Sequence, residues 1–201
     1  MAVMAMFPLG GVLFPFAYLP LHVFEPRYLA MVRYCLDSDA EFGVVLIERG
    51  SEVGGGDQRH MVATSARIVA VEESPDGRFG LIAQGTRRIR VEQWLPDFNY
   101  PQAEVEPWAD SSMVSSTDAV VARLRRSLAL AAELGISTAP ATLELEGESE
   151  AILWQACSFA PLGPADRYEL LCCVGAPQRT TALLRMLDDA IDTFSHRLRL
   201  G

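Results

Sequence analysis

The sequence LFP at positions 13–15, followed by PLHVFEPRY at positions 20–28, decides how the first part of this chain folds. Prolines at positions 8, 15 and 20 exclude a continuous helix here, because proline lacks the amide donor that a helix interior needs. The segment is therefore predicted to form short extended pieces with sharp bends. A helix is predicted to begin at Pro26, where proline loses no helical hydrogen bond, and to end near residues 37–39.

The remainder of the first half is typical of strands. Residues 42–48 (FGVVLIE) are apolar and rich in β-branched side chains, and SPDG at positions 74–77 is typical of a tight turn. Gly85 is predicted to break the chain between two strands. The expected strands cover residues 42–48, 66–72, 78–84, 86–94 and 102–108.

After Asp110 the pattern changes to helices, with apolar residues at three- and four-residue spacing and with proline and glycine at the boundaries. The first helix follows a cluster of capping residues at 115–118, and the second covers about residues 148–159. The third begins at Pro164, and the fourth begins at Pro177. An apolar seam on the fourth helix is formed by Leu184, Leu187, Ile191, Phe194 and Leu198. The chain is thus predicted to divide into a β-rich part, residues 1–110, and a helical part, residues 111–201.

The chain of 201 residues contains no lysine, since all 17 of its basic residues are arginine. This excludes a Walker A lysine, a Ser-Lys dyad and a Schiff-base amine. A net charge of −9 argues against nucleic acid and anionic membranes as main partners. No basic residue precedes Arg27 and prolines interrupt the apolar start, so we expect neither a signal peptide nor a membrane span, and a cytoplasmic location.

The cysteines and histidines show no metal-binding spacing. Four cysteines are present without a C-x-x-C pair, and the three histidines are scattered. The cysteines are expected to be core thiols of a reducing compartment. No metal and no cofactor is predicted.

The two opening motifs resemble the signature of the Lon N-terminal domain family, the substrate-recognising domain of the ATP-dependent Lon protease. Further blocks resemble the same family, although Ala63 stands where the family usually has glycine. These blocks are ATSARI at 63–68, DGR at 76–78, GTRRI at 85–89, WQA at 154–156, PL at 161–162 and RML at 185–187. The resemblance implies an α+β fold, in which a β-rich pseudo-barrel of the PUA-like, Lon N-terminal type is followed by a helical bundle.

The same resemblance implies that the chain holds polypeptides without cleaving them. Lon's motor needs a Walker A lysine and its peptidase needs a Ser-Lys dyad, and neither can be formed here. The predicted function is non-catalytic binding of unfolded or apolar polypeptide segments by a stand-alone domain. It would act as an adaptor or quality-control factor, with a protease or chaperone as partner machinery.

Four aromatic residues flanked by proline and polar residues are the candidate contacts for a bound polypeptide. They are Phe16, Tyr18, Phe98 and Tyr100, all placed in predicted loops. Aromatic side chains in loops on a rigid scaffold are suited to gripping an extended apolar chain.

The polar residues of the second motif are interpreted as structural. Arg27 is expected to pair with a carboxylate, and Glu25 is expected to stabilise the start of the helix that carries Tyr28. The alternative is that His22, Glu25 and Arg27 orient a substrate for acid–base catalysis, but the sequence offers no nucleophile or metal partner for them.

The strand predicted at residues 86–94 supports a second hypothesis, an RNA-binding module. Arg88 and Arg90 alternate with Ile89 and Val91, which predicts one face on the core and one in water. With Arg87 and Trp94, this face could bind a single strand by charge and stacking, although a solvated strand face is the favoured interpretation. An enzyme using a cleft between the two halves is the third hypothesis.

Overall fold

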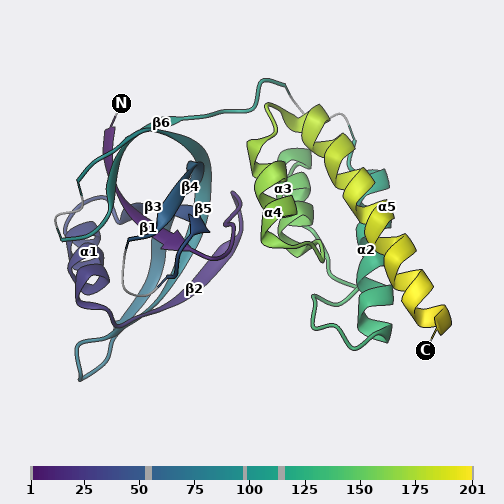
Figure 1. The fold of residues 1–201 in the computed structure, drawn as a ribbon, viewed down its shortest axis with the longest axis horizontal. Helices are drawn as coiled ribbons and strands as arrows, with labels where there is room; N and C mark the ends of the chain where they lie inside the picture. The colour runs from purple at the N-terminus through teal and green to yellow at the C-terminus, as the bar shows by residue number, and fades with distance from the viewer. Residues whose placement is uncertain (1, 53–55, 97–98, 113–115, 201) are drawn as a thin grey trace. The chain divides into compact units, whose positions relative to one another are not determined.

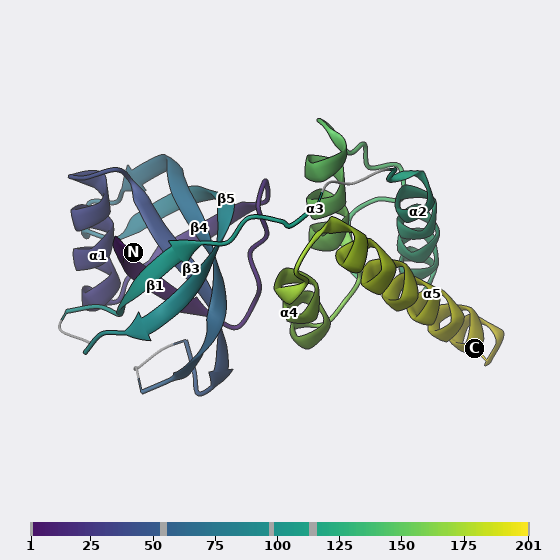
Figure 2. The ribbon, with the colours of Figure 1, turned by 90° about the horizontal axis from the view of Figure 1, so that it is seen from above.

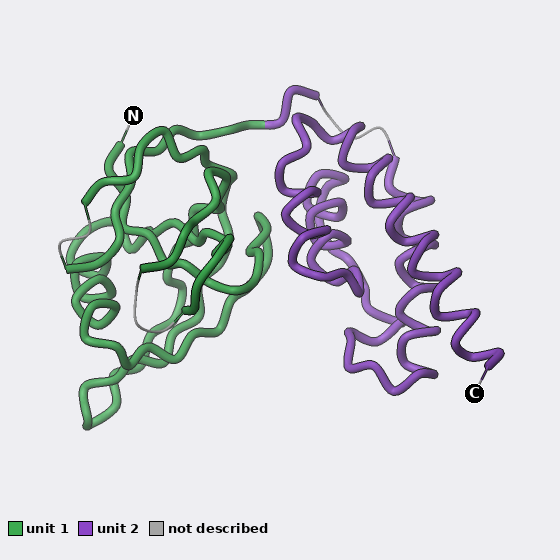
Figure 3. The backbone as a smooth tube through the Cα atoms, viewed as in Figure 1, with its two compact units in different colours: residues 1–109 green, residues 110–201 purple. Residues whose placement is uncertain are grey.

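The computed structural model describes residues 2–52, 56–96, 99–112 and 116–200. The chain divides into two compact units, Met1–Ala109 and Asp110–Gly201 (Figure 3). The sequence places this boundary one residue later, after Asp110. Each unit is described by itself below.

Six strands of the first unit form one sheet that closes on itself (Figures 1 and 2). The sheet order is β2-β5-β4-β3-β1-β6, and β5 also pairs with β6, which closes five strands into a barrel. β1 and β3 are parallel, and the other pairs are antiparallel. The strands are β1 (Ala2–Leu9), β2 (Tyr18–Val23), β3 (Glu41–Arg49), β4 (Gln58–Glu73), β5 (Phe79–Trp94) and β6 (Gln102–Pro107).

The long strand β5 shows that the predicted break at Gly85 is wrong. β5 continues through Gly85, and its first part pairs with β2 while its last part pairs with β6. β4 runs alongside both parts and has a register shift between Ser65 and Ala66, close to Gly85. Glycine therefore permits a bend and a close backbone approach inside one strand, rather than ending it.

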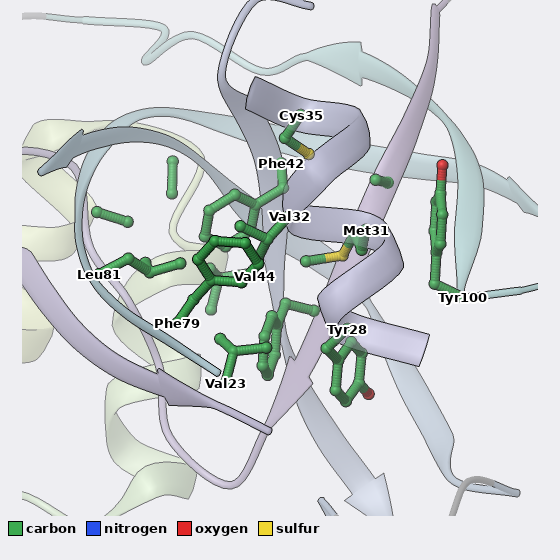
Figure 4. Packing of buried hydrophobic residues seen from close by; sticks show 14 of the residues in the cluster. Val23, Tyr28, Met31, Val32, Cys35, Phe42, Val44, Phe79, Leu81 and Tyr100 are labelled. Atoms are coloured by element: carbon green, nitrogen blue, oxygen red, sulfur yellow. The ribbon is translucent and has the colours of Figure 1, made fainter. Parts of the chain in front are cut away.

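Helix α1 (Pro26–Leu36) begins at the predicted proline and covers one side of the barrel. Figure 4 shows its buried side chains directed toward sheet residues that include Phe42, Val44 and Phe79. The ring of Tyr28 stacks on Phe7 of β1, with 4.2 Å between the ring centroids. Burial of each such side chain stabilises the fold by about 1.5–3 kcal/mol, so α1 is firmly fixed to the sheet.

The second unit contains four helices, α2 (Asp118–Glu133), α3 (Ser149–Phe159), α4 (Pro164–Cys172) and α5 (Ala176–Leu200). The apolar stripe of α2 faces α5, and the buried stripe of α5 includes Leu183, Leu187, Ile191 and Phe194. The predicted seam is confirmed at Leu187, Ile191 and Phe194, but Leu183 is buried in place of Leu184, and both Leu184 and Leu198 are half-buried. Among the described helices, none combines the length and the apolar character needed to cross a membrane.

Arg179 of α5 is fully buried and fixes the start of the helical unit. Its guanidinium donates to both carboxylate oxygens of Asp110, at 2.6 and 2.8 Å, and lies 3.5 Å from the ring centre of Trp154. Its Nε donates to the backbone oxygen of Leu170. This buried pair ties Asp110 to α3, α4 and α5, so Asp110 belongs with the helices.

Candidate functional site

The segment that leads into β2 holds an aromatic side chain outward on a strained backbone. Leu13 and Phe14 are buried, whereas Phe16 is 40% exposed and has a φ of 65°. A left-handed conformation costs a residue with a side chain about 1 kcal/mol or more. Such strain persists only where the surroundings enforce it, and it is concentrated at functional sites.

Gly85 enforces this conformation from the neighbouring strand. The Phe16 amide donates to the Gly85 oxygen at 2.8 Å, and the Gly85 amide donates to the Ala17 oxygen at 2.9 Å. A Cβ atom on Gly85 would lie 2.2 Å from the backbone oxygen of Phe14, so only glycine allows this approach. On the other side of the segment, the buried hydroxyl of Thr64 donates to the Leu13 oxygen at 2.6 Å.

The outer surface of β2, β5 and β4 next to this segment is apolar. Pro20 of β2 and Ala70 of β4 are the direct cross-strand neighbours of Ile82 on β5, and all three are exposed. Tyr18 is two residues before Pro20 on the same face and is 65% exposed. Its hydroxyl accepts a hydrogen bond from Gln84 at 3.3 Å. We call Tyr18, Pro20, Ala70 and Ile82, together with Phe16, the apolar face.

Strand β2 lies at the edge of the sheet. Among the described strands it pairs only with β5, so its other side carries no strand neighbour. Pro20 lies in the middle of this edge, and proline hinders the addition of another strand because it has no amide donor. A ligand at this edge would therefore be bound by side chains more than by strand addition.

Only some of the aromatic residues proposed from sequence reach this surface. Phe16 precedes β2 by two residues and Tyr18 begins it, and both are exposed, whereas Phe98 lies outside the described residues. Tyr100 does lie in the connection between β5 and β6, but its side chain is 9% exposed and belongs to the core beside α1. Its ring centroid is 6.0 Å from that of Tyr34. The expectation that Tyr100 is available for binding is therefore corrected: a loop position does not imply an exposed side chain. Sequence reasoning also missed Ile82, because the residues around it on β5 carry no signal that marks it as exposed.

The motif residues Glu25, Arg27 and Tyr28 lie together, and His22 does not join them. Arg27 Nε is 3.2 Å from a Glu25 carboxylate oxygen, Nη2 of Arg27 donates to the Glu52 oxygen, and the guanidinium lies over the Tyr28 ring. Burial raises the pKa of Tyr28 to about 12, so its hydroxyl remains protonated. Glu25 precedes α1 without a side-chain capping bond. The exposed His22 lies beside Phe24, with 6.1 Å between the ring centroids.

The arginines of β5 are engaged within the first unit. Arg87 donates to Glu41 at 2.9 Å, and Arg88 and Arg90 both lie over the ring of Trp108. Arg88 is 3% exposed, so the prediction that it faces water is wrong, because Trp108 covers this part of the strand. Burial would raise the pKa of Glu41, but hydrogen bonds from Arg67 and Arg87 outweigh it and hold that pKa below its usual value.

The fold is a six-stranded sheet, five strands of which close into a barrel, followed by a unit of helices. Residues 3–189 match the model of the ATP-dependent protease La (LON) substrate-binding domain. The chain therefore belongs to the Lon substrate-binding domain family.

The relatives agree with this assignment. Lon protease 2 of Herpetosiphon aurantiacus is 28% identical over 191 residues, which are 92% of this chain and 23% of that protein. Lon protease of Cytophaga hutchinsonii is 33% identical over 49% of this chain and 12% of its own length. The chain thus spans about a quarter or less of these relatives and matches their substrate-binding part.

Solved structures show the same fold. A Lon N-terminal domain protein from Xanthomonas campestris has a TM-score of 0.65 and 26% identity, over 94% of this chain and 98% of that one. The N-terminal domain of the Mycobacterium avium complex Lon protease has a TM-score of 0.61 over 95% of this chain and 98% of that one, and at 17% identity it supports the fold alone.

Proposed function

We propose that this chain binds exposed apolar segments of unfolded polypeptides at the apolar face and has no catalytic activity of its own. The observation that carries the proposal is the rigid outward display of Phe16. It is held in a left-handed conformation by Gly85, next to the 65% exposed Tyr18. A protein that keeps a strained, exposed aromatic residue loses stability by doing so, which is expected where the residue contacts a ligand.

The composition of the face suits an unfolded chain. Phe16, Tyr18, Pro20, Ala70 and Ile82 offer apolar contacts on a fixed sheet, and Gln84 beside Tyr18 adds a polar group. Aromatic side chains on a rigid base contribute large contact areas with little loss of conformational entropy on binding. Such a surface binds many sequences weakly, as substrate selection requires.

We further propose that the chain acts in the cytoplasm as an adaptor or quality-control factor that passes bound polypeptides to a protease or chaperone. Its relatives named Lon protease match through the same domain, which supports a link to proteolysis. The four cysteines, all within the described residues, form no disulfide, which fits a reducing compartment. The arginines of β5 do not favour the RNA-binding alternative, since Arg87 pairs with Glu41, and Arg88 and Arg90 lie over the ring of Trp108.

The experiment is a fluorescence anisotropy titration with three labelled probes. The probes are reduced and carboxymethylated α-lactalbumin, which is unfolded, the native form of the same protein, and a single-stranded RNA of random sequence. We expect binding of the unfolded probe alone, with little dependence on salt. Equal binding of both lactalbumin forms, or binding of RNA that weakens steeply with salt, would contradict the proposal.

A further inference from the structure

A pocket of about 490 Å³ lies within the helical unit, at the end of α3. Its apolar wall includes Phe159, Leu162 and Phe194, and its other side is formed by residues 136–139, which connect α2 to the later helices. The half-buried Arg167 of α4 lines the same pocket. The pocket therefore places one cation beside apolar side chains.

Arg167 has no carboxylate partner among the described residues, unlike three other arginines whose guanidinium groups are shielded from solvent. Arg27, Arg59 and Arg179 pair with Glu25, Asp57 and Asp110. Arg167 instead donates from Nη2 to the backbone oxygens of Ser158 and Ala160, and no carboxylate among the described residues pairs with it. Burial lowers the pKa of Arg167, and the backbone oxygens at the C-terminal end of α3 stand in place of a carboxylate; an arginine remains protonated at neutral pH.

The remaining donors of Arg167 are open to a ligand. Nη1 and Nε have no acceptor among the described residues. Neither atom is fully buried, so a ligand can reach both. A guanidinium N–H is a strong donor to a carboxylate, and with Nη2 engaged Arg167 can offer one charge-assisted hydrogen bond, from Nη1 or from Nε. The charge of the pocket thus calls for a carboxylate ligand.

The connecting segment supplies the complementary groups for a peptide backbone. Residues 137–139 belong to no helix or strand, and their backbone groups make none of the hydrogen bonds found among the described loops. The hydroxyls of Ser137 and Thr138 also line the pocket. These groups are exposed or half-buried and open to water; a peptide can form hydrogen bonds with them in place of water, whereas the alkyl chain of a fatty acid cannot.

We propose that this pocket binds the C-terminal residue of a polypeptide chain. The terminal carboxylate is held by Arg167, and an apolar terminal side chain packs against Phe159, Leu162 and Phe194. A C-terminal residue carries a carboxylate and an apolar side chain on the same carbon, which an internal Asp or Glu does not. This inference rests on the proposed polypeptide-binding function and adds a second site with its own specificity, for chain ends.

The test uses the whole chain and labelled hexapeptides of sequence Gly-Ser-Gly-Ser-Ala-Leu. One peptide ends in a free carboxylate and the other in an amide, so they differ only in the group that Arg167 recognises. We expect the free acid to bind about tenfold more tightly, as a charge-assisted pair predicts. Equal affinity of the two peptides for the wild-type chain overturns the proposal without any mutation.

Variants then assign the effect to Arg167. We expect Arg167→Gln to remove the preference for the acid while binding of the amide changes little. Arg167→Lys should restore part of the preference. Arg185→Gln is the matched control, because Arg185 is exposed and pairs with Glu169. Since the comparison of acid with amide is made within each variant, a loss of stability does not imitate the result. A preference that survives in Arg167→Gln contradicts the assignment.

Two further experiments distinguish a peptide ligand from a fatty acid, and the pocket of Arg167 from the apolar face. Decanoate offers a carboxylate and an apolar chain without a peptide backbone, and binding of decanoate in place of the peptide would overturn the polypeptide assignment. Binding at the apolar face of an unfolded apolar peptide whose C-terminus is amidated should be unaffected by Arg167→Gln. Failure of the chain-end site therefore leaves a different signature from failure of the proposed function.

Discussion

The backbone oxygen of Phe14 lies 2.2 Å from the position that a Cβ atom of Gly85 would occupy. This close approach allows Gly85 to exchange backbone hydrogen bonds with Phe16 and Ala17. The same contacts direct Phe16 outward at the edge of the apolar face. Two sequence blocks far apart in the chain, LFP and GTRRI, are thereby joined at one point.

Substitution of Gly85 should therefore be costly. Gly85→Ala introduces a clash with backbone, which cannot move like a flexible side chain, and we expect the free energy of unfolding to fall by about 1–3 kcal/mol. Gly80→Ala on the same strand is the control, because nothing lies within 4 Å of its added Cβ. Urea unfolding followed by circular dichroism measures both, and equal stability of the two variants would show that the approach at Gly85 is not tight.

The strain at Phe16 can be separated from the contacts of its ring. Phe16→Ala and Phe16→Gly both remove the ring, but only alanine retains the cost of a φ of 65°. The glycine variant should be more stable than the alanine variant by about 1 kcal/mol in urea unfolding. Both should bind unfolded lactalbumin equally weakly. An alanine variant as stable as the glycine variant would mean that the backbone there is unstrained.

Arg27 is predicted to act in stability and not in binding. Arg27→Ala removes the ion pair with Glu25, the hydrogen bond to the Glu52 oxygen and the contact over the Tyr28 ring. We expect a loss of about 1–2 kcal/mol in the free energy of unfolding, with binding of unfolded polypeptide unchanged. Arg78→Ala serves as control, because the Arg78–Asp76 pair is more than half exposed and should change stability little. Lost binding with an unchanged melting temperature would instead assign Arg27 to a ligand site.

The lowered pKa of Glu41 predicts that the free energy of unfolding depends on pH. Its pKa is lowered in the folded state, so the charged form is favoured by folding. The resulting stabilisation is present above the unfolded value of about 4.3 and is lost as the pH falls through the lower folded value. Glu41→Gln should therefore be less stable than the wild type at neutral pH, with a gap that closes in acid below about pH 4. Urea unfolding at a series of pH values measures the gap, and a gap that stays constant would contradict the role of Arg67 and Arg87.

Local patterns were sufficient for some elements and insufficient for others. The start of α1 at Pro26 was predictable because the proline signal is local. The continuity of β5 through Gly85 was not, because it depends on β2 and β6 pairing with different parts of one strand. The burial of Arg88 under Trp108 depends on the path of the chain after β6 and has no signal within residues 86–94.

The candidate site was predictable only in part, for the same reason. Phe16 and Tyr18 could be named from their proline-rich context, whereas the addition of Ile82 requires the register between β2 and β5. Tyr100 has a similar context but is buried by its packing beside α1. The buried pair between Arg179 and Asp110 joins residues far apart in sequence. The residues next to each of them in the sequence give no signal that it is buried.

The most direct test of the account is the affinity of the double variant Tyr18→Ser, Ile82→Ser for unfolded lactalbumin. Val3→Ser is the matched control, since Val3 is equally apolar and 59% exposed but lies on β1, paired with Glu104 and outside the apolar face. We predict at least a tenfold loss of affinity for the double variant, and wild-type affinity and stability for the control. Unchanged binding by a folded double variant would contradict the central claim that the apolar face holds the polypeptide.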